Sequence, residues 1–185
     1  MRHTVREELK GIVTFVVVIW AVFIVDAMLP ADLRDFGLIP RTGLGLIGVP
    51  AMPFLHANFQ HICSNTVPLV ILLALLAGSH ATSWQIVTRI VVLGGLLLWV
   101  FGRPATHIGA SGLVFGLAAF LIVAGFVEKR PLSLLISLLV MFLYGGSLLA
   151  GMLPSIGPEV SWDGHLTGFI AGGWVAYRFA RQAIR

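Results

Sequence analysis

The segment SGLVFGLAAFLIVAGFV, residues 111–127, carries no charged side chain along its whole length. An apolar run of roughly 17–25 residues is long enough for one helix to cross the hydrocarbon core of a bilayer. Five similar runs occur elsewhere in the chain, so we expect six membrane-spanning helices. Their predicted bounds are Gly11–Leu29, His61–Gly78, Trp84–Phe101, Ser111–Val127, Pro131–Leu153 and Trp162–Ala180. The predicted fold class is therefore an all-α membrane protein.

The composition supports this interpretation. Of the 185 residues, 58% are hydrophobic and only 11% are charged, whereas a soluble domain carries about 25% charged residues. A chain of this length has room for one compact bundle, so we expect a single transmembrane domain over residues 1–185. The net charge of +4 does not indicate nucleic-acid binding, because membrane proteins gather Lys and Arg in their cytoplasmic segments.

The basic residues also predict the orientation of the bundle. With the N-terminus inside, the cytoplasmic segments hold Arg2, Arg6, Lys10, Arg89, Lys129, Arg130, Arg178, Arg181 and Arg185. Only Arg34, Arg41 and Arg103 fall on the opposite side. This bias predicts that both termini are cytoplasmic.

The first connection, at about residues 30–58, differs from an ordinary loop. It is broken too often by Gly and Pro to cross the membrane, and it is too apolar to be fully solvated. Segments of this kind lie in the headgroup region of the bilayer. We therefore expect a loop that is half embedded in lipid.

Few polar or ionisable side chains accompany the predicted helices. Such residues are costly inside a membrane and mark function more often than they do in soluble cores. Those near the predicted outer helix ends are His56, His61, Asn65, His107, Ser111, Asp163 and His165. Asp26 lies near the outer end of the first helix, and the sequence indicates no partner for it.

Ser111 has two interpretations when its own segment is taken alone. Leu113 stands where the Gly-x-Ser-x-Gly elbow of soluble hydrolases has its second glycine, so that motif is absent. Gly112 and Gly116 instead form a small-xxx-small pair, which is typical of close helix packing. This segment alone favours a packing role for the serine.

His165 changes that balance in favour of a nucleophile. Gly168 and Gly172 follow it at offsets of three and seven, and these offsets place them on the same helix face. Two glycine faces in close contact would bring His165 to Ser111, where it can act as the general base. Asp163 lies two residues before the histidine and points away from it on a helix. We therefore expect a Ser–His dyad without a carboxylate.

A second group of polar residues can stabilise an oxyanion. His61 and Asn65 lie four residues apart on one helix face, and both can donate hydrogen bonds together with the main-chain N–H of Ser111. The alternative is a hydrogen-bonded pair between helices. His56 lies off this face, so we expect a structural role for it and regard it as a secondary site candidate. The spacing of five between the two histidines, with no Glu nearby, argues against zinc, and we expect no metal and no cofactor.

These motifs together resemble the rhomboid intramembrane serine proteases. The matching stretches are GASG with Ser111, GHLTGFIAG with His165, and HANFQHICSN with His56, His61 and Asn65. The predicted six helices and the embedded first loop are similar to the minimal bacterial form of that family.

The resemblance implies a role for each matching residue. Ser111 would be the nucleophile and His165 the general base, while His61, Asn65 and the N–H of Ser111 would form the oxyanion site. The supporting residues would be Gly109 in the loop that holds the nucleophile and the helix-packing residues Gly112, Gly116, Gly168 and Gly172. Some members carry a Tyr that stacks on the catalytic histidine; the matching residue here is Phe115, which can stack but cannot donate a hydrogen bond. Many members also have a Trp-Arg pair in the first loop, and the stretch Pro40–Arg41 does not match it.

The resemblance implies an endopeptidase of the bacterial plasma membrane whose active site faces the extracytoplasmic side. Its partners would be the lipid bilayer and membrane-protein substrates that are cut in or near a transmembrane helix. One alternative is a catalytically silent relative that binds membrane helices, although such relatives typically lack the serine or the histidine. A transporter or channel would need charged residues or broken helices along a path to the cytoplasm, and the sequence shows none.

Overall fold

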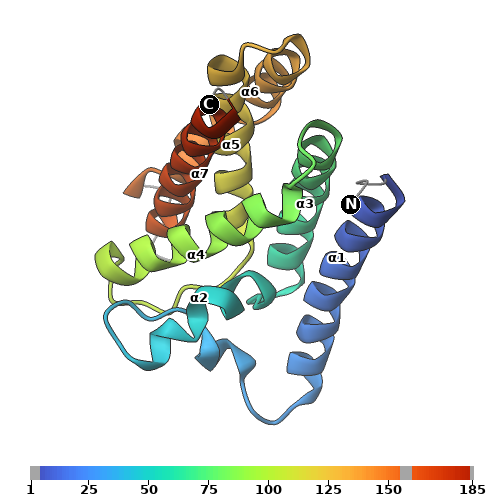
Figure 1. Ribbon diagram of the computed structural model, residues 1–185. Coiled ribbons are helices and arrows are strands. Elements are labelled where there is room, and N and C mark those ends of the chain that lie inside the picture. The colour runs from blue at the N-terminus through green and yellow to red at the C-terminus, as the bar shows by residue number, and fades with distance from the viewer. Residues whose placement is uncertain (1–4, 155–159, 184–185) are drawn as a thin grey trace.

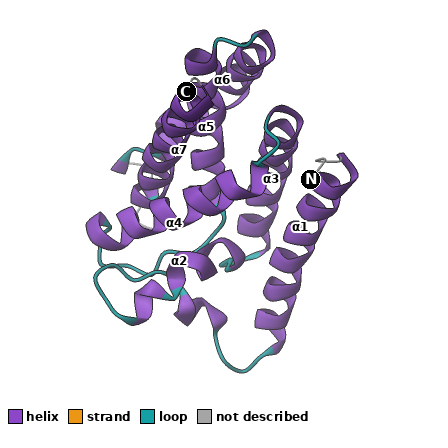
Figure 2. Ribbon diagram, viewed as in Figure 1, coloured by secondary structure: helices purple, strands orange, loops and turns teal. Residues whose placement is uncertain are grey.

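The computed structural model describes residues 5–154 and 160–183, and these residues form a bundle of long helices (Figure 1). The long helices are α1 (Val5–Met28), α3 (Phe59–Ser79), α4 (Ser83–Phe101), α5 (Ser111–Glu128), α6 (Pro131–Gly151) and α7 (Trp162–Ala183). The described residues contain no strand (Figure 2). Each long helix corresponds to one predicted span, with ends that differ by a few residues. The prediction of an all-α membrane bundle is confirmed.

Five of these helices, α1 and α3 to α6, are long and apolar enough to cross a membrane. The protein is therefore a multi-pass membrane protein. The remaining long helix, α7, carries Asp163 in its first turn and Arg178 and Arg181 near its other end, so it is less apolar than the other five. Its small side chains face the interior, where Ala171 and Ala176 are buried.

The helix α5 lies at the centre of the bundle and contacts α3, α4, α6 and α7. At its contact with α7, the main-chain atoms of the two helices lie directly against each other. A Cβ atom on Gly168 would collide with the carbonyl oxygen of Gly112, and one on Gly172 would collide with that of Gly116. Only glycine allows this separation, as in other small-xxx-small contacts. The contact aligns the first turns of α5 and α7 at one end of the bundle.

The first loop is folded into four short helical segments between α1 and α3. They are η1 (Leu33–Phe36), η2 (Leu44–Leu46), α2 (Gly48–Ala51) and η3 (Met52–Phe54). This loop lies at the end of the bundle opposite the start of α1 and the end of α7 (Figure 1). Leu44 and Ile47 are about half exposed, at 52% and 50%, which supports our proposal that the loop is half embedded in lipid.

Backbone hydrogen bonds join the first loop to the segment that precedes α5. Leu38 and His107 exchange two N–H···O bonds of 3.0 and 2.8 Å, and the Gly109 N–H donates to the Met52 carbonyl over 3.0 Å. The position of the first loop thereby sets the position of the residues just before Ser111.

Arg41 also anchors the first loop to the end of α4, a role that the sequence motifs did not indicate. Its guanidinium donates to the carbonyl oxygens of Val100 and Gly102 over 3.0 and 2.9 Å. The indole of Trp99 donates in return to the Thr42 carbonyl over 2.8 Å. The first loop is therefore held against the end of α4 although the Trp-Arg pair is absent from it.

Candidate active site

Ser111 and His165 lie within hydrogen-bond distance of each other. Ser111 is the first residue of α5, His165 lies in the first turn of α7, and the distance from Ser111 Oγ to His165 Nε2 is 2.9 Å. The other ring nitrogen, Nδ1, is 2.8 Å from the Gly151 carbonyl oxygen. Because a carbonyl oxygen only accepts hydrogen bonds, Nδ1 must carry the proton. In the neutral imidazole Nε2 is then unprotonated and can accept the hydroxyl proton of Ser111.

Gly151, the last residue of α6, is a member of this site that the sequence did not reveal. Its carbonyl group orients His165 in the way that a carboxylate does in a catalytic triad. The absence of a side chain is also needed, because a Cβ atom there would lie 2.5 Å from the Phe115 ring and 3.4 Å from His165 Nδ1. A main-chain acceptor leaves no residue type to recognise, so only the structure could identify it.

Phe115 stacks directly on the imidazole of His165. The ring centroids are 4.1 Å apart and the planes differ by 9°. Phe115 lies one helical turn after Ser111, so the same face of α5 holds both the hydroxyl and the aromatic ring. The stacking and the bond to Gly151 together restrain the orientation of His165.

His61 and Asn65 face the backbone just before Ser111. A Cβ atom on Gly109 would lie 2.7 Å from His61 Nε2 and 3.6 Å from Asn65 Nδ2. The Ala57 N–H donates to His61 Nδ1 over 3.4 Å, so Nε2 carries the proton and points it toward Gly109. Gly109 has a φ of 107°, a conformation that other residues rarely adopt. The loop therefore needs glycine at position 109 for two reasons: the backbone has a positive φ, and a side chain would collide with His61.

The backbone N–H of Ser111 adds a third potential donor. It belongs to the first turn of α5, where amide groups have no carbonyl partner within the helix. The positive end of the helix dipole lies at the same place and favours negative charge. Two side-chain donors and one main-chain donor thus surround the region next to the serine hydroxyl.

His56 does not reach Ser111 or His165 but supports His61. Its ring lies edge to face against that of His61, with centroids 5.0 Å apart, and it is only 2% exposed. Burial, with a further contribution from the neighbouring His61, lowers the pKa of His56 from 6.5 to about 4. His56 is therefore neutral near pH 7 and packs as an uncharged aromatic ring.

His107 belongs to a separate cluster between the α4–α5 connection and the start of α7. Its Nδ1 lies 2.7 Å from Ser161 Oγ, and its Nε2 lies 3.2 Å from the Arg103 carbonyl oxygen and 3.6 Å from Asp163 Oδ2. Asp163 also accepts a 2.8 Å hydrogen bond from the Arg103 N–H. The carboxylate of Asp163 is thus engaged by this cluster and is not a partner of His165.

Asp26 has a structural partner that its sequence context did not indicate. Its Oδ1 accepts a 2.7 Å hydrogen bond from the Leu33 N–H at the start of η1. The guanidinium of Arg34 lies 3.9 Å from Oδ2. Asp26 therefore ties the end of α1 to the first loop.

The described residues contain no group of three His, Cys, Asp or Glu side chains that could hold a metal ion. The arrangement at Ser111 instead combines a hydroxyl, an oriented base and nearby hydrogen-bond donors. These groups are the ones that acyl transfer through a serine requires.

Comparison with known proteins assigns the class. Residues 45–182 match the family model of the Rhomboid domain, so the chain belongs to the rhomboid family, whose members are generally intramembrane serine proteases. An uncharacterized protein of Mycobacterium tuberculosis is 42% identical over 177 residues, which cover 90% of this chain and 72% of the relative. An uncharacterized protein of Mycobacterium leprae is 38% identical over 177 residues, which cover 90% of this chain and 69% of the relative. The resemblance in the sequence motifs is thus confirmed at the level of the family.

Proposed function

We propose that this protein is an intramembrane serine endopeptidase that cleaves transmembrane segments of other membrane proteins. The observation that carries the proposal is the 2.9 Å contact between Ser111 Oγ and an unprotonated His165 Nε2. In the first step, His165 takes the hydroxyl proton while Ser111 attacks the scissile carbonyl carbon. The imidazolium then gives that proton to the leaving amine, and water hydrolyses the acyl-enzyme by the reverse sequence.

The donors next to Gly109 support the same chemistry. Attack on the carbonyl group moves negative charge onto its oxygen, and fixed donors stabilise that charge in the transition state. We assign this role to His61 Nε2, Asn65 Nδ2 and the Ser111 N–H. The proton on His61 Nε2, which follows from the Ala57 bond to Nδ1, makes the imidazole a donor in its neutral form.

The substrate must change conformation before Ser111 can attack it. The carbonyl groups of a transmembrane helix are engaged in the hydrogen bonds of that helix, so the scissile stretch has to unwind locally. Substrates with Gly or Pro near the cleavage site should therefore be preferred. Ser111 and His61 are only half-buried, which leaves a path for the water that completes the reaction.

We further propose that the site faces the extracytoplasmic side of the plasma membrane. The first loop and the Ser111–His165 pair lie at the end of the bundle away from most of the basic residues. Cytoplasmic segments are the ones enriched in Lys and Arg.

The proposal is tested with a single-span model substrate in proteoliposomes, comparing wild type with Ser111→Ala and His165→Ala. We expect cleavage by the wild type and loss of essentially all cleavage in both variants. Thermal unfolding of each variant in detergent checks that the fold is intact. Cleavage by Ser111→Ala, or inhibition by chelators without inhibition by serine-directed phosphonates, would contradict the mechanism. A folded wild type that cleaves no substrate and reacts with no phosphonate would favour the non-catalytic, helix-binding alternative.

A further inference from the structure

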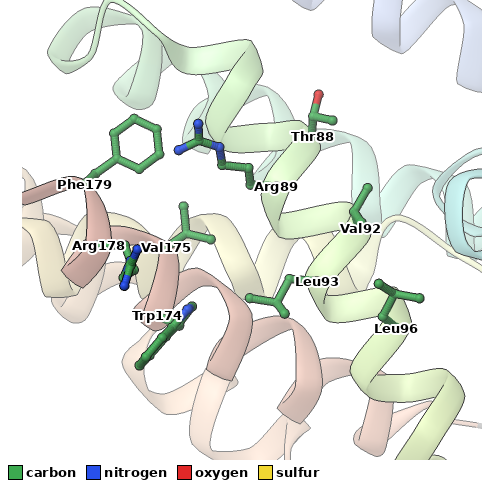
Figure 3. Close-up of a pocket in the computed structure, with 9 residues that line it drawn as sticks. All are labelled: Thr88, Arg89, Val92, Leu93, Leu96, Trp174, Val175, Arg178 and Phe179. Atoms are coloured by element: carbon green, nitrogen blue, oxygen red, sulfur yellow. The ribbon is translucent and has the colours of Figure 1, made fainter. Parts of the chain in front are cut away.

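A groove with a volume of about 530 Å³ runs between α4 and α7 (Figure 3). The residues that line it include Arg89, Leu93 and Leu96 of α4 and Trp174, Arg178 and Phe179 of α7. Arg178 follows His165 by thirteen residues on the same helix, which corresponds to about 20 Å along its axis. The residue of the groove nearest to His165 on α7 is Trp174, nine residues or about 14 Å along the axis, and neither Ser111 nor His165 lines the groove.

The two ends of the groove differ in chemistry. Arg89 and Arg178 lie at one end, and both side chains are exposed. The guanidinium of Arg89 is placed 4.6 Å above the centre of the Phe179 ring, which holds it over the groove. Figure 3 shows Arg89 of α4 reaching across toward Phe179 of α7. No acidic residue lines the groove, so the two positive charges have no protein counter-ion within it.

The opposite end of the groove is apolar. Val92 and Leu96 are 44% and 42% exposed, and the half-buried Leu93 lies between them. From Arg89 to Leu96 the groove follows α4 for about 10 Å. Trp174 forms the facing wall and is 55% exposed. A ligand that fits would carry negative charge at one end and a hydrocarbon chain at the other.

We propose that this groove binds an anionic phospholipid of the leaflet on the side of the basic helix ends. The phosphate lies between Arg89 and Arg178, which present planar donors suited to phosphate oxygens. One acyl chain follows Val92, Leu93 and Leu96 toward the middle of the membrane. Basic pockets between helices on the cytoplasmic side are a known form of lipid site. The bound lipid joins α4 to α7, the helix that carries His165.

The shape of the groove distinguishes this ligand from two others. Inorganic phosphate would use the two arginines but leave the apolar end exposed. A transmembrane helix of a partner would cover the apolar end but leave the two charges without a counter-ion, at a cost in free energy inside a membrane.

The test uses the full chain reconstituted in phosphatidylcholine bilayers that contain a few per cent of a phospholipid with dibrominated acyl chains. Bromine quenches tryptophan fluorescence at short range, and the contribution of Trp174 is obtained by subtracting the signal of Trp174→Phe. Brominated phosphatidylglycerol is compared with brominated phosphatidylcholine at equal fractions. We expect phosphatidylglycerol to be preferred about 30-fold at Trp174, or about fivefold for each arginine.

Two double variants distinguish lipid binding at a defined site from a general attraction of anionic lipid by the positive charge of the protein. Arg89→Gln/Arg178→Gln should remove the preference, whereas Arg130→Gln/Arg181→Gln changes the net charge equally outside the groove and should retain it. Thermal unfolding confirms that each variant is folded. Equal quenching by both lipids, equal loss in both double variants, or displacement by millimolar inorganic phosphate would overturn the proposal. Protection of Trp174 from both lipids would overturn it as well, because the groove would then be filled by protein.

Discussion

Among the residues that the structure describes, two Ser–His pairs lie at the end of the bundle next to the first loop. Ser111 and His165 are 2.9 Å apart, and Ser161 and His107 are 2.7 Å apart. The second pair also has a carboxylate, Asp163, at 3.6 Å from the far ring nitrogen, so in outline it is closer to a catalytic triad than the first. Distance and composition alone would favour Ser161, whereas the proposed function assigns the reaction to Ser111.

The surroundings of the two hydroxyl groups favour Ser111 as the nucleophile of the proposed reaction. Ser111 lies beside Gly109, above which His61 and Asn65 present N–H donors. The ring of His107 faces acceptors, the Arg103 carbonyl and the carboxylate of Asp163. These acceptors lie at the ring nitrogen away from Ser161, and among the described residues no N–H donor group like that of His61 and Asn65 adjoins the Ser161 hydroxyl, so a developing oxyanion would lack stabilisation there. We infer that the second pair anchors the start of α7, and thereby His165, to the α4–α5 connection.

The largest predicted effect separates the two serines by their reactivity. A fluorophosphonate probe should label the wild type, while Ser111→Ala and His165→Ala should lower the labelling rate by at least about 10³-fold. Ser161→Ala should be labelled at the wild-type rate. We expect the Ser161 hydroxyl not to react with the probe in the wild type, because no oxyanion site adjoins it. Labelling is followed by in-gel fluorescence and the modified residue by peptide mass spectrometry. Label on Ser161, or normal labelling of folded Ser111→Ala, would reverse the comparison.

A smaller effect is expected when a single oxyanion donor is removed. Asn65→Ala should lower kcat by about 10²-fold with little change in KM, because the bond is formed mainly in the transition state. Asp163→Asn is the matched change in the second cluster, and it should leave kcat within about threefold of wild type in the folded protein. Both are measured with the proteoliposome substrate. An unchanged kcat in Asn65→Ala would remove this residue from the proposed oxyanion site.

The sequence was sufficient to predict the elements that depend on side-chain type. Long apolar runs predicted the six long helices, and the glycine pairs after Ser111 and His165 predicted which two helices touch. The order of the polar motifs identified the family. These features could be predicted because helix length, helix face and small residues each follow from local spacing along the chain.

The parts that the sequence did not predict depend on main-chain atoms or on distant segments. The Gly151 carbonyl that orients His165 has no side chain, and the Leu38–His107 bridge joins two loops without a shared motif. The anchoring role of Arg41 depends on carbonyl groups at the end of α4 that become available only in the folded chain. The partner of His107, Ser161, lies 54 residues away along the chain, and no local spacing links the two residues.

A modest effect is expected from the stacking of Phe115 on His165, the proposed general base. Phe115→Leu retains apolar bulk against His165 but removes the aromatic face, so the imidazole loses a contact worth about 0.5–1.5 kcal/mol. We expect kcat to fall by about two- to tenfold, with Phe115→Tyr close to wild type. Among the described residues no aromatic ring stacks on His107, so the second pair offers no equivalent substitution for comparison. A rate for Phe115→Leu equal to that of wild type would show that the bond to Gly151 alone orients the ring.

The smallest effect on catalysis, and the clearest on stability, belongs to His107. Burial lowers the pKa of His107 below its usual value of 6.5, although the nearby Asp163 opposes this shift. The unfolded chain therefore binds a proton at this residue more readily than the folded protein does. The contribution of neutral His107 to stability is complete above about pH 6.5 and is lost as the pH falls below that value. Thermal unfolding in detergent between pH 5 and pH 8 should show this loss in the wild type. Buried His56 contributes a loss of the same sign, so His107→Gln should reduce the pH dependence without removing it, while cleavage at pH 7.5 stays within about threefold. If His107→Gln instead abolished cleavage in a folded protein, the second pair would be part of the chemistry and not only an anchor for α7.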